Sequence, residues 1–170
     1  MEYNLPSEIV KDLNFGDEAK SRVMDGVRKL AEAVSSTLGA SGKCVIYEDA
    51  RGKPVITKDG VTVANSVVLF DAVENIGATL IKEAAGNTVR EAGDGTTTAT
   101  VLAYNLLKYA YEKVNDETVR DLKQGIESCY DKVVEYLESV KIDVDEEKLK
   151  DVASISCNND VKLGSIIAEA

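Results

Sequence analysis

GDGTTTAT, residues 93–100, places an acid between two glycines and follows it with three threonines. The next residues, VLAYNLLKYA (101–110), have the apolar spacing of a helix. Threonine is a poor residue for a helix interior, because its branched Cβ is stiff and its hydroxyl competes for backbone hydrogen bonds. The start of this helix is therefore a candidate site.

A helix that begins at these threonines would offer free backbone N–H groups and a partial positive charge to an anion. Gly93 and Gly95 leave the backbone open to a ligand, and the threonines at 96–98 add hydroxyl donors. Asp94 would repel bare phosphate, but Mg²⁺ commonly binds one or two carboxylates together with phosphate oxygens. The stretch therefore indicates a Mg²⁺-nucleotide site. The alternative is a plain cap, in which Asp94 caps the helix and the threonines only fill its first turn.

Two further stretches bear on this choice. TLGASG (37–42) is a glycine-punctuated loop directly after a helical pattern. TKDG (57–60) is an Asp-Gly turn that begins a helical segment beside a lysine. Each alone is typical of an ordinary turn, but the three together favour a nucleotide site.

Composition excludes several classes of function. The 170 residues contain no His, which removes His-based acid–base catalysis and His metal sites. A net charge of −10 argues against binding to nucleic acid or to an anionic membrane surface. The sequence has no apolar run of 18 residues and no signal-peptide pattern, so we expect a soluble, cytoplasmic protein. Cys44, Cys129 and Cys157 form no CxxC pair, and we expect buried thiols in a reducing compartment.

The apolar periodicity predicts a mainly helical chain with one small β element. Longer helices are predicted from 17 to about 39, from 71 to the glycine at 93, from the threonines to about 114, and from 119 to 140. A short helical segment follows 60, and two short helices follow 148. Asp71 with Glu74 resembles a capping box at a helix start. CVIYE (44–48) and PVIT (54–57) predict a β-hairpin.

The segments between these elements have polar or mixed patterns. They are predicted as an N-terminal arm (1–15), a helix junction NDET (115–118), a boundary KIDVDEEK (141–148) and a loop SISCNND (154–160).

The motifs resemble those of the group I chaperonins, the GroEL kind, in order and spacing. The resemblance is carried by TLGASGKCVIYEDARGKPVITKDGVTVA (37–64), ENIGA (74–78), AGDGTTTATVLA (92–103) and SISCNND (154–160). It implies a mainly α fold with a small β-hairpin, a multihelical bundle like the chaperonin equatorial domain. In that fold residues 1–140 would form the N-terminal part of the ATP-binding equatorial domain. Residues 141–170 would begin the α/β intermediate domain.

The resemblance also implies roles for single residues. Asp59 would face the γ-phosphate and help to orient the attacking water. Asp94 would hold Mg²⁺. A K⁺ site built largely of backbone oxygens would lie at Thr37 and Lys58. The residues that would contact ATP are Thr37, Leu38, Gly39, Ala40, Lys58, Asp94, Gly95, Thr96, Thr97 and Thr98.

The function implied by the resemblance is ATP-dependent protein folding. The subunits would form a homo-oligomeric ring that binds unfolded client proteins, hydrolyses Mg-ATP and has a lid co-chaperonin as a further partner. The family's returning segment, with another catalytic aspartate, is not among the 170 residues, so we expect a fragment that is inactive alone. The alternative is a complete, non-enzymatic module that co-assembles with or regulates a chaperonin ring. An unrelated Mg-nucleotide enzyme is a third hypothesis, although the sequence lacks the GxxxxGK[ST] pattern of a P-loop.

Overall fold

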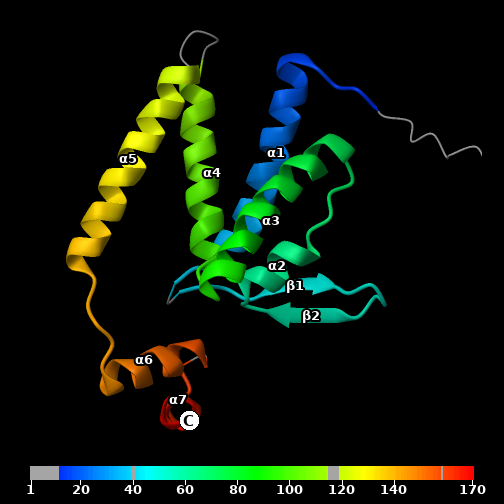
Figure 1. The fold of residues 1–170 in the computed structure, drawn as a ribbon. Helices are drawn as coiled ribbons and strands as arrows, with labels where there is room; N and C mark the ends of the chain where they lie inside the picture. The colour runs from blue at the N-terminus through cyan, green and yellow to red at the C-terminus, as the bar shows by residue number, and fades with distance from the viewer. Residues whose placement is uncertain (1–11, 40, 115–118, 158) are drawn as a thin grey trace, which may run out of the picture. The chain divides into compact units, whose positions relative to one another are not determined.

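The computed structural model describes residues 12–39, 41–114, 119–157 and 159–170. Along the described chain the elements are α1 (Gly16–Ser35), β1 (Val45–Glu48), β2 (Pro54–Thr57), α2 (Gly60–Ser66), α3 (Ala72–Ala92), α4 (Thr96–Lys113), α5 (Val119–Val140), α6 (Glu146–Ser156) and α7 (Val161–Glu169). Their contacts divide the chain into two units, Met1–Val114 and Asn115–Ala170. In the first unit α1, α3 and α4 pack together beside α2 and the hairpin (Figure 1). The mainly helical prediction with one small hairpin is confirmed.

α1 and α3 approach closely because each contributes a glycine to their contact. A Cβ atom built at Gly26 of α1 would lie 1.8 Å from the backbone oxygen of Glu74. One built at Gly77 of α3 would lie 2.0 Å from the backbone oxygen of Val23. No side chain fits at these distances, so backbone packs directly on backbone. The apolar core beside this contact consists of Val27, Leu30, Val34, Val63, Ala64, Ala78 and Ile81.

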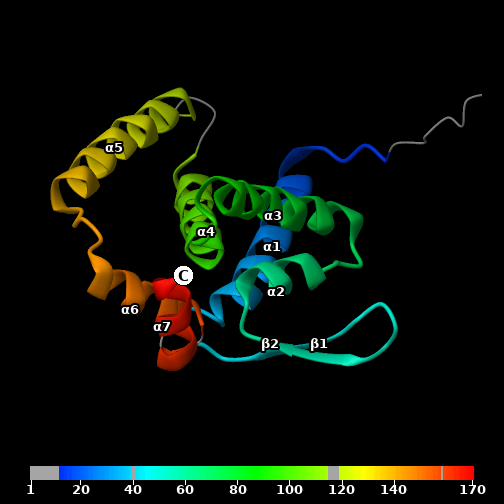
Figure 2. The ribbon, with the colours of Figure 1, turned by 60° about the horizontal axis from the view of Figure 1, so that its bottom comes forward.

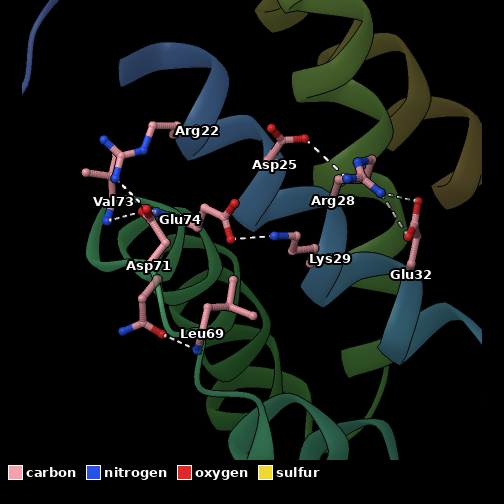
Figure 3. Close-up of polar contacts among 10 residues, drawn as sticks. Arg22, Asp25, Arg28, Lys29, Glu32, Leu69, Asp71, Val73 and Glu74 are labelled. Carbon is pink, nitrogen blue, oxygen red and sulfur yellow. Dashed lines mark hydrogen bonds and ion pairs between the residues drawn. The ribbon is translucent and has the colours of Figure 1, made fainter. Parts of the chain in front are cut away.

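Two ion pairs also join α1 to the start of α3 (Figure 3). Arg22 donates to the carboxylate of Asp71, and Lys29 Nζ lies 2.5 Å from Glu74 Oε2. Asp71 is the N-cap of α3 and accepts the amides of Val73 and Glu74. The Glu74 amide and then the Arg22 guanidinium hold the pKa of Asp71 below its usual range. Asp71 thus forms the predicted cap, while the Glu74 side chain pairs with Lys29.

The two strands form an antiparallel hairpin in which Ile46 pairs with Ile56 and Val45 with Thr57. Side chains alternate between the two faces, so Val45 packs against the core while Ile46 and Ile56 are exposed. In both ribbon views α2 lies between the hairpin and the pair α1–α3 (Figures 1 and 2). The hairpin follows the predicted strands within one residue.

In the second unit α6 and α7 pack closely at a glycine. A Cβ atom built at Gly164 would lie 2.3 Å from the hydroxyl of Ser154. Asp145 caps α6 and Asp160 caps α7 through backbone amides. α5 has no buried residue among those that the structure describes.

Several predicted boundaries are wrong by a few residues. α1 ends at Ser35 rather than near Gly39, because the chain then tightens into turns in which the amides of Thr37 and Leu38 donate to the carbonyls of Val34 and Ser35. The predicted loop 154–160 is shorter, since its first three residues belong to α6.

The prediction of buried cysteines is also wrong. Cys44 and Cys129 are exposed, and Cys157 is partly exposed. Cys129 lies on α5, which buries none of its described residues within this chain. The predictions for 115–118 and for most of the N-terminal arm lie outside the described residues.

Gly77→Ala is expected to destabilise the first unit, because the added methyl would overlap the Val23 backbone oxygen. We expect the free energy of unfolding, measured by urea denaturation, to fall by about 2–3 kcal/mol. Gly86→Ala on the same helix is the matched control, because nothing lies within 4 Å of its Cβ position. Helix propensity should make that variant more stable by about 0.5–1 kcal/mol. Equal stability of the two variants would contradict direct backbone packing.

Candidate functional site

Two glycines shape the turn between α3 and α4. Gly93 has φ +74° and Gly95 has φ +87°, in the left-handed region that side chains disfavour. Gly93 ends α3, and its amide donates to the carbonyl of Val89 at 2.9 Å. Gly95 is the N-cap of α4. The chain therefore passes from one helix to the next with only Asp94 between these glycines.

α4 begins without a side-chain cap among the residues that the structure describes. The Asp94 carboxylate accepts the amide of Gly95 at 2.6 Å, and Asp94 lies before the N-cap position. The hypothesis of a plain cap at Asp94 is therefore wrong. The first-turn amides of this 18-residue helix are available to an anion, and the helix dipole favours negative charge there.

The three threonines have different surroundings. Thr96 is buried, and its carbonyl accepts the hydroxyl of Thr100 at 2.9 Å. Thr97 is partly buried and packs against Gly60, whereas Thr98 is exposed. The first two side chains therefore help to fix the start of α4, and Thr98 faces solvent.

Gly60, the first residue of α2, is where three parts of the first unit meet. A Cβ atom built there would lie 2.1 Å from Thr97 Oγ1 and 3.5 Å from Val34 Cγ1. Val34 lies at the end of α1, and its carbonyl accepts the Thr37 hydroxyl at 2.7 Å. The structure thus brings together the end of α1, the N-terminus of α2 and the N-terminus of α4. These are the positions of the three stretches singled out in the sequence.

Asp59 is the N-cap of α2. Its Oδ1 accepts the amide of Val61 at 3.2 Å, and its Oδ2 accepts both the amide of Thr62, at 2.9 Å, and the Thr62 hydroxyl. Partial burial raises the pKa of Asp59, but these hydrogen bonds outweigh burial and hold the pKa below its usual range. Asp59 is therefore ionised at neutral pH and suited to orient a water molecule or to face a cation.

The other predicted site residues lie on exposed turns. Leu38 and Gly39 follow α1, with Gly39 at φ +76°, and Lys58 lies between β2 and α2. Ala40 lies outside the described residues. Within the described part of the chain no hydrogen bond or ion pair joins Asp94 to Asp59.

The donor set suits a metal that arrives with a nucleotide. The residues that the structure describes contain no group of three or more His, Cys, Asp or Glu able to hold a metal ion. Asp94 instead offers one exposed carboxylate beside the uncapped amides of α4. Mg²⁺ is commonly bound by one or two carboxylates, waters and substrate phosphates, so these residues fit Mg²⁺ bound to phosphate.

Gly60 and Thr62 shape this site, although the sequence analysis did not identify them as site residues. Gly60 allows Thr97 to approach α2, and Thr62 binds the Asp59 carboxylate. The sequence does allow the contact of Thr62 with Asp59 to be predicted, because Thr62 is the third helical residue after an N-cap aspartate. No local signal identifies the contact between Gly60 and Thr97.

Residues 30–170 match the TCP-1/cpn60 chaperonin family. The chain belongs to this family. The chaperonin gp146 from the bacteriophage EL 2 (Pseudomonas aeruginosa), crystallised in two forms in the presence of ATP-BeFx, has a similar structure. Both crystal forms match with a TM-score of 0.78 and 31% sequence identity, over 91% of this chain. The match covers 28% of the gp146 chain, so this chaperonin chain spans well under half of that protein's length.

The predicted resemblance to chaperonins is therefore confirmed at the level of family and fold. The assignment to group I stays a prediction. Among the described helices of this chaperonin chain, none combines the length and apolar character that crossing a bilayer requires.

Gly60→Ala is expected to destabilise the packing of α2 against α4, because the new methyl would displace the Thr97 hydroxyl or the start of α4. Overpacking of this kind costs about 1–3 kcal/mol, so we expect the free energy of unfolding, measured by urea denaturation, to fall by that amount. Gly86→Ala is the control, since its Cβ position on α3 is open. Wild-type stability in Gly60→Ala would mean that this contact does not hold the two helix N-termini together.

Proposed function

We propose that this chain is the N-terminal nucleotide-binding part of a chaperonin subunit that hydrolyses Mg-ATP. The observation that carries the proposal is the contact between Gly60 and Thr97, which joins the uncapped N-terminus of α4 to the N-terminus of α2, headed by Asp59. Helix N-termini attract phosphate, and phosphoryl transfer needs a group that orients the attacking water. The presence of ATP-BeFx in the gp146 crystals supports the same assignment.

The proposed roles follow from charge and position. The amides and hydroxyls of residues 95–98 would bind phosphate oxygens, and the turn 37–40 with Lys58 would contact the rest of the nucleotide. Asp94 would hold Mg²⁺, which neutralises phosphate charge when bound. Asp59 would orient the attacking water. A K⁺ site at the backbone oxygens of Thr37 and Lys58 remains part of the proposal.

The larger assembly is proposed from the family. Residues 1–140 would belong to the equatorial domain and 141–170 would begin the intermediate domain; α5 ends at Val140, and Asp145 caps the next helix. Subunits would assemble into a homo-oligomeric ring in the cytoplasm and fold client polypeptides, with a lid co-chaperonin as a further partner. ATP hydrolysis would require the complete subunit in its ring.

Asp94→Ala tests the proposed Mg²⁺ ligand. We expect loss of the Mg²⁺-dependent part of ATP affinity, a weakening of about tenfold or more, because a charge-assisted contact to the cation is removed. The measurement is isothermal titration of the chaperonin with ATP, with and without Mg²⁺. Glu91→Ala is a charge-matched control, because Glu91 is an exposed acid at the end of α3. An Asp94→Ala protein with unchanged Mg²⁺ dependence would contradict the assignment.

Asp59→Asn tests the catalytic role, since Asn keeps the capping ability but removes the charge. We expect kcat for ATP hydrolysis to fall about tenfold or more while ATP still binds, as is typical of a lost general base. Asp71→Asn changes another N-cap aspartate of the same unit and should reduce thermal stability without this loss of kcat. Normal turnover in Asp59→Asn, or failure to bind ATP at all, would argue against the role.

A further inference from the structure

We propose that Thr62 is a positioning residue that turns the Asp59 carboxylate so that Oδ1 is the oxygen left with room for a water molecule. The proposal rests on the proposed function, in which Asp59 orients the water that attacks ATP. Thr62 would not itself contact the nucleotide or the water.

The hydrogen bonds around Asp59 distribute unevenly over its two oxygens. Oδ2 accepts two bonds from Thr62, one from its amide and one from its hydroxyl. Oδ1 accepts one bond, from the amide of Val61 at 3.2 Å. A carboxylate oxygen accepts about two hydrogen bonds, so the described contacts fill Oδ2 and leave one position on Oδ1.

This pattern differs from two other aspartate caps in the described chain. Asp71 accepts both of its capping amides on a single oxygen, and so does Asp160. The third helical residue after those caps is Glu74 or Leu163, neither of which has a hydroxyl. At Asp59 the third residue is Thr62, and the two amides bind different oxygens. Arg22 binds the second oxygen of Asp71 from another helix, whereas at Asp59 a hydroxyl of its own helix accompanies the turned carboxylate.

The backbone of Asp59 is held on both sides. Its amide donates to the Thr57 hydroxyl at 3.1 Å, and its carbonyl accepts the amide of Val63 at 3.0 Å. Val63 is fully buried in the core. Because the backbone is anchored, the rotation of the side chain is the remaining freedom, and Thr62 restricts it.

The pKa shift of Asp59 agrees with the hydrogen bonds from Thr62. Partial burial raises the pKa of Asp59, and the Thr62 hydroxyl makes the largest opposing contribution. No charged side chain on α1, α3 or α4 contributes to the shift among the described residues. Lys58, next to Asp59 in the sequence, is exposed. The Thr62 hydroxyl is thus the main side-chain partner of the Asp59 carboxylate among the described residues.

Thr62→Val is the test, because it removes the hydroxyl but keeps the side-chain shape and the backbone amide. In the assembled chaperonin we expect kcat for ATP hydrolysis to fall about tenfold with little change in KM, because the water is misplaced. Thr62→Ser keeps a hydroxyl and should restore kcat. Ser66→Ala is the control, since that hydroxyl lies on the same helix and bonds to the Val63 carbonyl.

A double variant gives a second readout. In the Asp59→Asn background Thr62→Val should cause no further loss of kcat, since both changes affect the same carboxylate. A Thr62→Val protein that melts earlier but keeps wild-type kcat would show Thr62 to be structural only and overturn the proposal. A loss of kcat in Thr62→Val that Thr62→Ser does not restore would also overturn the proposal. A wild-type chaperonin that hydrolyses no ATP would overturn the proposed function itself, whereas an active wild type with an unaffected Thr62→Val overturns this inference alone.

Discussion

The direct backbone contact between α1 and α3 sets the geometry of the first unit. Glycine within a helix costs about 0.5–1 kcal/mol relative to alanine, yet α1 and α3 each have one at their contact, Gly26 and Gly77. The short separation lets the buried side chains of α1 meet Ala78 and Ile81 of α3, and it brings Arg22 and Lys29 within reach of the start of α3. α2 and α4 pack against this pair, so the positions of their N-termini depend on it.

Elements defined by local signals were predictable from the sequence. α4, α5 and the hairpin agree closely with their apolar periods, and Asp71 caps α3 as its spacing indicates. The end of α1 was misplaced because the chain continues after Ser35 as tight turns, which apolar spacing does not distinguish from a helix. The cysteines were misjudged for a different reason: residue type favours burial, but α5 buries none of its described residues within this chain.

In the candidate site, too, features set by neighbouring residues were predictable from the sequence, and contacts between distant residues were not. The sequence marked the region 93–98 and the Asp-Gly turn at 59, because glycine and aspartate in turns have local meanings. It could not show that Thr97 packs on Gly60, because that contact joins residues far apart in the chain. It also left open whether Asp94 is a cap. The left-handed Gly95 resolves this by taking the N-cap position itself.

The connection between α3 and α4 has a further geometric consequence. Only Gly93, Asp94 and Gly95 separate the two helices, so the start of α4 lies within a short reach of the end of α3. The close backbone contact of α3 with α1 lies at Gly77, and at 1.5 Å per residue the end of α3 is roughly 22 Å away. α3 thus connects the close contact with α1 to the proposed phosphate site. A change in the angle between α1 and α3 would move the amides that would face the nucleotide by an amount that grows with this distance.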